Sequence, residues 1–144
     1  MPAEIEVKGL QELINKVGRI TPEIQRAMDK TMEASLNTLH ENVPSYPRKP
    51  EASSYIRTGT LGKSIGMNNA KPTVYSIKGS GAKIEGRFGT DLSYAKYVID
   101  PDRQAYMHRG RWWTTENIVK ASKSKILRLW DKMIQIVKRR LNLR

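Results

Sequence analysis

The sequence lacks cysteine, which excludes disulfide bonds and thiolate metal sites and fits a reducing cytoplasm. It also lacks any apolar run long enough to span a membrane, so we expect no membrane partner. The N-terminal residues 1–6 have no basic stretch followed by an apolar one, so no signal peptide is expected.

Acidic residues are scarce relative to basic ones. The 144 residues include 26 Lys and Arg against 14 Asp and Glu, a formal net charge of +12. Such a charge favours polyanionic partners, either nucleic acid or acidic protein surfaces, and says little about the fold. The length suits a single domain over residues 1–144 with one modest core.

A nucleotide-binding signature is incomplete in this chain. Gly62-Lys63-Ser64 matches the end of a phosphate-binding loop, but Arg57 stands where the first glycine of that motif is required. The preceding residues 51–55 are polar and do not resemble a buried strand. The motif therefore predicts a turn followed by a short helix that buries Leu61 and Ile65, with no nucleotide at Lys63.

Metal and catalytic groupings are equally incomplete. Asp100, Asp102 and His108 lie close in sequence, but nothing supplies the further ligands that a metal-dependent nuclease needs. His40 is expected at the surface or at an edge of the core, since no second ligand is spaced for a metal. We expect a non-enzymatic protein with no catalytic residues, cofactor or metal.

The secondary-structure pattern predicts an α+β fold, in which two long amphipathic helices pack on a small, mainly antiparallel sheet. Apolar residues at helical spacing predict a helix over 10–17, another over Pro22–Val43 that Pro44 ends, and a last helix over 115–141 begun by Thr114 or Thr115. Alternating residues predict a short strand at Ile5–Val7 and a hairpin over Val74–Thr90. The last helix is long for so small a core, so its basic end is expected to project.

A proline-rich loop follows the second helix. Residues 44–57 show no apolar period, which predicts a long exposed loop that is poorly ordered until it meets a neighbour. Its aromatic and basic residues form a candidate assembly loop: Tyr46, Arg48, Lys49, Tyr55 and Arg57.

The densest aromatic and basic cluster lies just before the last helix. Such residues stack on bases and neutralise phosphates, and they are also enriched at protein–protein hot spots. A third interpretation is that the tryptophans close the end of the core, and we expect one of them in the core and the other at an interface. The candidate interface residues are Tyr106, Arg109, Arg111, Trp112 and Trp113.

The order of several short motifs resembles a known family. A strand leads into Val7-Lys8-Gly9-Leu10, and a long helix ends at Val43-Pro44. Later motifs follow in this order: Thr58-Gly59-x-Leu61-x-x-Ser64-Ile65, Gly89-Thr90 and Tyr94-Ala95-x-Tyr97-Val98. This order resembles the small tail-completion, or head–tail connector, proteins of long-tailed bacteriophages and prophages, over most of the chain.

The resemblance implies a non-catalytic virion protein of the head–tail joint, assembled in the bacterial cytoplasm. It implies a homo-oligomeric ring, for which six copies are expected. The ring would contact the neighbouring connector and tail proteins. Genomic DNA would pass through the ring channel without specific recognition. The alternative is a basic nucleic-acid-binding module that uses the Trp112–Trp113 cluster and the C-terminal helix.

Overall fold

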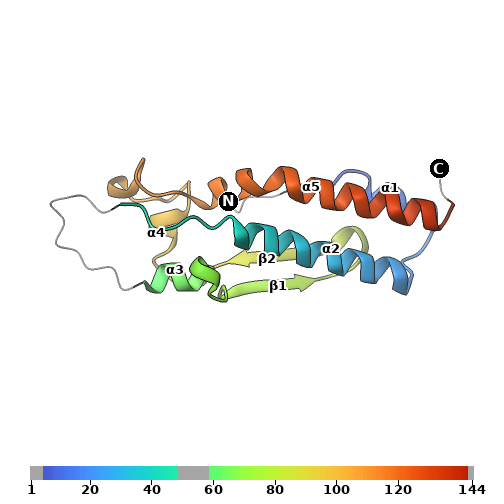
Figure 1. The fold of residues 1–144 in the computed structure, drawn as a ribbon, viewed down its shortest axis with the longest axis horizontal. Coiled ribbons are helices and arrows are strands. Elements are labelled where there is room, and N and C mark those ends of the chain that lie inside the picture. Colours follow the sequence, from blue (N-terminus) through green and yellow to red (C-terminus); the bar gives the residue numbers. More distant parts are fainter. Residues whose placement is uncertain (1–4, 49–58, 143–144) are drawn as a thin grey trace.

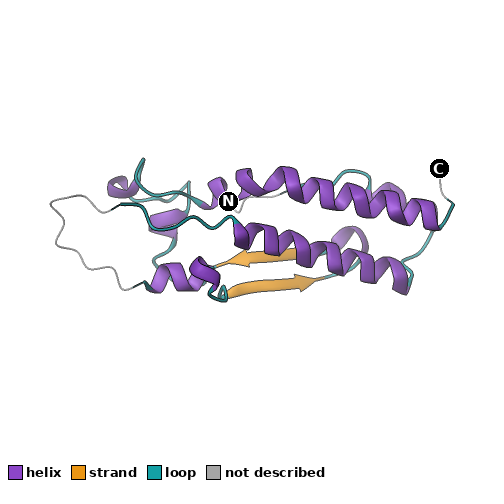
Figure 2. Ribbon diagram, viewed as in Figure 1, coloured by secondary structure: helices purple, strands orange, loops and turns teal. Residues whose placement is uncertain are grey.

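Two long helices and a hairpin define the architecture of this chain (Figure 1). The computed structural model describes residues 5–48 and 59–142. Helix α2 (Pro22–Glu41) contacts α5 (Thr115–Arg140) on one side and both strands of the hairpin on another. The predicted α+β class is confirmed, with an antiparallel sheet packed by long amphipathic helices (Figure 2).

Helix α2 begins and ends near the residues that the sequence indicates. The Thr21 side chain caps it by accepting a hydrogen bond from the Ile24 amide at 3.2 Å, and Pro22 occupies the first turn. The helix ends at Glu41, shortly before Pro44. Its buried residues fall on one face: Ile24, Met28, Ser35, Leu36 and Thr38.

Helix α1 (Leu10–Val17) also matches its predicted bounds, and Gly18 ends it in a left-handed conformation at φ 78°. Leu10 and Leu13 are buried and belong to the core that α2 and α5 share. The other buried members of this core are Ile24, Met28, Ile126, Trp130, Met133, Ile134 and Val137. Helix α1 therefore helps to cover the C-terminal half of α5.

The packing of α1 against the C-terminal half of α5 contradicts the expectation that the basic end of α5 projects. At about 1.5 Å per residue the 26 residues of α5 span about 39 Å, yet its buried residues run from Ile118 to Val137. Near its last turn, Arg140 forms an ion pair of 3.2 Å with Glu23 of α2. The prediction was wrong because it did not count α1 and the start of α2 as partners of α5.

The predicted hairpin is confirmed, with a more elaborate connection than a simple turn. Strands β1 (Val74–Lys78) and β2 (Glu85–Gly89) pair antiparallel, and a short 3₁₀ turn, η2 (Gly81–Lys83), lies between them. A side chain at Gly86 would collide with Met32 of α2, so glycine lets α2 approach β2 closely.

The predicted N-terminal strand is wrong, because residues 5–8 form no strand in the structure.

A side-chain contact also links the hairpin to α2. The Tyr75 hydroxyl of β1 donates a hydrogen bond of 3.1 Å to the Asn37 Oδ1 atom. Partial burial, together with the nearby Glu33 carboxylate, raises the pKa of Tyr75 above its ordinary value. A phenol is protonated at neutral pH in any case, so the raised pKa extends its ability to donate further into alkaline solution.

A second, smaller core lies at the other end of the molecule. Helix α3 (Thr60–Ile65) buries Leu61 and Ile65 there, as the sequence predicts. The remaining buried members are Ala95, Ile99 and Ile118. His40 is half-buried at the edge of this region, with its Nε2 atom 2.8 Å from the Gly66 carbonyl oxygen.

Candidate partner-binding site

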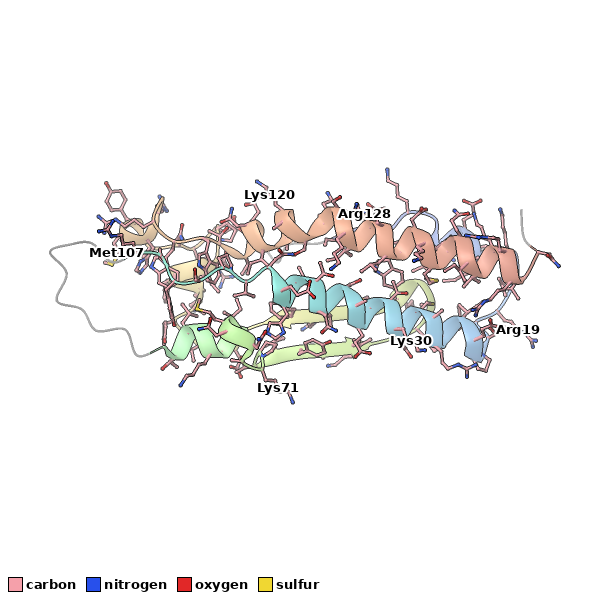
Figure 3. The ribbon with its side chains drawn as sticks, in the orientation of Figure 1. Arg19, Lys30, Lys71, Met107, Lys120 and Arg128 are labelled. Carbon is pink, nitrogen blue, oxygen red and sulfur yellow. The ribbon has the colours of Figure 1, made fainter. Side chains whose placement is uncertain are left out.

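The most exposed large hydrophobic side chains of the described residues lie at one end of the molecule, between α4 (Lys96–Ile99) and α5. A 3₁₀ turn, η3 (Tyr106–His108), leaves Tyr106 89% exposed and Met107 68% exposed. Figure 3 shows Met107 at this end, beyond the two long helices. Arg109 and Arg111 follow directly and are exposed. Together these four side chains form the tip patch: Tyr106, Met107, Arg109 and Arg111.

A buried glutamine holds the loop that carries the tip patch. The side-chain amide of Gln104 donates to the carbonyl oxygens of Val98 at 2.7 Å and Trp112 at 3.3 Å, which ties the two ends of the loop together. The backbone amide of Ala105 donates to the Tyr97 carbonyl at 2.7 Å. These bonds fix the backbone on both sides of the loop, so the exposed side chains of the patch are presented from a defined scaffold.

An aromatic cluster lies beneath the tip patch. Trp112 makes edge-on ring contacts with Tyr46, at a centroid distance of 5.5 Å, and with His108, at 6.2 Å. Trp113 lies against Trp112 at 5.8 Å. Both tryptophans are half-buried and pack against the second core, and which of them meets a partner stays a prediction. The fully buried tryptophan is instead Trp130 of α5, which is 2% exposed.

The aromatic cluster also anchors the start of the proline-rich loop. The Trp113 indole nitrogen donates to the Ser45 carbonyl at 3.0 Å, and the Tyr46 hydroxyl accepts a hydrogen bond of 2.7 Å from the Gly62 amide. These bonds attach the first residues of the loop to Trp113 and to α3, although the stretch has no apolar period. Arg48 is exposed beside the anchored residues, whereas Lys49, Tyr55 and Arg57 of the candidate assembly loop lie outside the described residues.

The structure places the predicted interface residues at two levels. Tyr106, Arg109 and Arg111 are exposed on the tip patch, whereas Trp112 and Trp113 are half-buried in the aromatic cluster. The sequence analysis missed Met107, because a lone apolar residue in a loop carries no periodic signal that tells exposure from burial. It missed Gln104 for a related reason, since burial of a polar residue depends on carbonyl groups that the fold brings together.

The outer face of α5 forms a second surface of distinct character. Its exposed cations are Lys120, Lys123, Arg128, Lys132 and Arg139. Figure 3 shows Lys120 and Arg128 projecting from α5 on the side away from α2. Lys120 pairs with Glu116 on the same helix, at 3.2 Å. The other cations of this surface are also exposed, so most of its positive charge faces solvent. We call this surface the basic face.

Residues of the two incomplete enzyme signatures make other contacts in the fold. The Gly62 amide, which a phosphate-binding loop would direct at phosphate, donates to Tyr46, and Lys63 is exposed on α3. Asp100 accepts from the Asp102 amide at 2.9 Å and lies 3.9 Å from Arg103. Within residues 5–48 and 59–142, no three His, Asp or Glu side chains gather where they could hold a metal ion. No helix in the same ranges is both long and apolar enough to cross a membrane.

Comparison with known proteins gives no match: no protein-family model, no curated protein and no solved structure matches the chain.

Proposed function

We propose that this chain is a non-enzymatic structural protein of a bacteriophage or prophage particle that helps to join head and tail. In this proposal it acts as a tail-completion or connector component that assembles into a ring, for which six copies are expected. The order of short motifs from Val7 to Val98 suggests the family, and the tip patch is the structural feature that supports an assembly role.

The composition of the tip patch supports a protein partner. Tyrosine, methionine and arginine are enriched in protein–protein interfaces relative to the rest of the surface. Tyr106 and Met107 are exposed, with Arg109 and Arg111 directly after them, on a loop whose ends Gln104 ties together. A rigid patch loses little conformational entropy when it binds, so it suits repeated contact between identical subunits.

The position of the tip patch leaves it accessible to a neighbouring subunit, since it lies at one end of an elongated molecule (Figure 3). In the proposed ring it contacts a different surface on the next subunit. Such head-to-tail contacts close into rings when the rotation between subunits divides a full turn. The proposed partners are therefore further copies of this chain and the neighbouring connector and tail proteins.

Deletion of the gene in the phage or prophage that encodes this chain tests the proposal. We expect DNA-filled heads and separate tails, which electron microscopy of the lysate detects. Complementation with Tyr106→Ala/Arg111→Ala should fail to restore joining, while the purified variant keeps the thermal stability of the parent. The matched control is Arg19→Ala/Lys30→Ala, two exposed cations away from the tip patch, which should restore infectious particles (Figure 3). Infectious particles from the deletion itself would refute the proposal.

A second candidate function is binding of nucleic acid through the basic face. The cations of α5 favour contact with phosphates, while the half-buried rings of Trp112 and Trp113 are engaged with Tyr46, His108 and Ser45. This candidate therefore rests on charge rather than on stacking of bases. Tight DNA binding by the chain together with normal particles after gene deletion would favour it over the first proposal.

A further inference from the structure

An apolar hollow lies between strand β2, helix α2 and helix α5. Its volume is about 790 Å³, within the range of about 300 to 1,000 Å³ that is typical of ligand-binding pockets. Several apolar side chains that line it are half-buried rather than fully buried: Ile5, Val7, Met32, Leu39, Val74, Ile84, Phe88 and Val119. Solvent therefore reaches the lining, and further apolar side chains that entered the hollow would remove it from water.

Two exposed carboxylates line the same hollow. Glu6 lies in the N-terminal segment, and Glu85 begins β2. Arg87 also lines the hollow and pairs with Glu85 at 2.9 Å, but an exposed ion pair of this kind contributes little and can exchange partners. Several other carboxylates pair with cations elsewhere on the same chain: Glu12, Glu23, Glu41 and Glu116. The hollow thus combines an apolar lining with carboxylates at its exposed positions.

The tip patch has the complementary character. Tyr106 and Met107 project into solvent, and the cations of Arg109 and Arg111 follow them. The hollow can bury the two projecting side chains, while its carboxylates can receive the two arginines. Burial of apolar area would supply affinity, and opposite charges would orient the contact.

The two surfaces belong to different parts of the molecule. The described lining of the hollow comes from residues 5–10, α2, α3, the hairpin and α5, whereas the tip patch lies beyond the two long helices (Figure 3). The hydrogen bonds of Gln104 hold the ends of the tip loop, which keeps the patch away from the hollow of its own chain. A contact between the two surfaces therefore joins two copies. Because it joins unlike surfaces, it is a head-to-tail contact.

We propose that the tip patch of one copy docks in the hollow of the next copy. Tyr106 and Met107 lie against the apolar lining, and the two arginines of the patch lie beside Glu6 and Glu85. This inference rests on the proposed assembly of identical subunits, and it names the surface that receives the tip patch.

The absence of cysteine allows a crosslinking test between copies. The tip variant carries Met107→Cys at an exposed position, and the hollow variant carries Val119→Cys, a replacement of similar size at a half-buried position. The two purified variants are mixed in equal amounts at high concentration under mild oxidation. We expect disulfide-linked dimers that contain one chain of each variant, which a non-reducing gel and intact mass identify.

The matched control mixes the tip variant with Arg128→Cys, which places the thiol on the side of α5 away from α2 (Figure 3). This mixture should crosslink about tenfold more slowly, although its thiol is the more exposed, because docking raises the local concentration of thiols only in the hollow. Equal rates in the two mixtures would overturn the proposal. Dimers of the tip variant with itself as the main product, or no mixed dimers at all, would also overturn it.

An exchange of charges tests the arginine contacts. Adding Arg109→Glu/Arg111→Glu to the tip variant should slow mixed crosslinking about tenfold, because two attractions become repulsions. Adding Glu6→Arg/Glu85→Arg to the hollow variant should then restore most of the rate. An unchanged rate after the first exchange, or no recovery after the second, would overturn the proposed docking.

The docking and the phage role can fail separately. Mixed dimers together with infectious particles from the gene deletion would support the docking and refute the phage role. If mixed dimers do not form but the deletion leaves separate heads and tails, the docking alone is refuted.

Discussion

Single residues decide how closely the elements of this chain approach one another. Gly62 is the clearest case, because a methyl group at its Cα would lie 2.8 Å from the Tyr46 hydroxyl and 2.9 Å from the Met67 sulfur. Its amide also donates to that hydroxyl. The glycine that resembles part of a nucleotide-binding motif thus serves the contact between α3 and the start of the proline-rich loop.

Gly62→Ala should therefore lower the free energy of unfolding by about 1 to 3 kcal/mol, because the added methyl group forces Tyr46 or Met67 to move. Urea denaturation of the purified variant measures the change. Gly89→Ala is the matched control, since nothing lies within 4 Å of a methyl group there, and it should change stability by less than about 0.5 kcal/mol. Equal effects at the two positions would contradict the argument.

A buried hydrogen bond joins α5 to α2 at the centre of the main core. The Trp130 indole nitrogen donates to the Ser35 hydroxyl at 2.9 Å. Ser35→Ala leaves the buried indole donor without this acceptor, which should cost about 1 to 3 kcal/mol of unfolding free energy. In Trp130→Phe/Ser35→Ala the donor is gone as well, so the double variant should lose less than the two single losses combined. If the two single losses of unfolding free energy add up strictly in a double-mutant cycle, measured by thermal or urea denaturation, the hydrogen bond contributes nothing to stability.

At the scale of elements, the helices were predictable because each carries its own signals. Apolar residues at helical spacing mark α1, α2 and α5, and Thr21-Pro22 and Gly18 mark two of the ends. The alternating hairpin was predictable for the same reason. The third strand was predicted at Ile5–Val7 from equally local alternation, but a strand needs a partner ladder, and local sequence does not show whether that ladder forms.

Local sequence did not decide which of two threonines caps α5. Thr114 and Thr115 were equal candidates for its cap, and the structure selects Thr114, whose amide donates to the Asn117 Oδ1 atom at 2.7 Å. Asn117→Ala removes this acceptor and should lower the unfolding free energy by about 0.5 to 1 kcal/mol. Asn117→Asp keeps an acceptor oxygen and adds a favourable charge at the helix N-terminus, so it should match or exceed the parent. Circular dichroism melts compare the three proteins, and a loss in Asn117→Asp equal to that in Asn117→Ala would contradict the assignment.

At the scale of the whole molecule, contacts between distant segments determined what sequence reasoning missed. Tyr46 lies in a stretch without apolar period, yet Gly62 and Trp112 meet it in the fold. The end of α5 looked unsupported because its cover comes from α1 and the beginning of α2, at the opposite end of the chain. The tip patch was found in part, since Tyr106, Arg109 and Arg111 stood out by composition alone.

The net charge of +12 is also a property of the whole molecule, and the fold concentrates part of it on the basic face of α5. Exposed cations on one helix face attract phosphates without reading bases, because nothing there forms a recognised base-reading motif. We therefore expect weak binding to duplex DNA that falls steeply with salt and does not depend on sequence.

Substitution of two cations on the basic face tests this expectation. Arg128→Ala/Lys132→Ala should weaken binding to any duplex and should reduce the slope of log affinity against log salt by about 2, since each lost phosphate contact contributes about 0.9. The matched control is Lys71→Ala/Lys78→Ala, which removes the same charge from exposed positions near the hairpin. Fluorescence anisotropy with two duplexes of unrelated sequence, titrated over a range of salt, measures both quantities. If the control weakens binding as much, net charge rather than the basic face is responsible, and a preference for one duplex at physiological salt would show that bases are read.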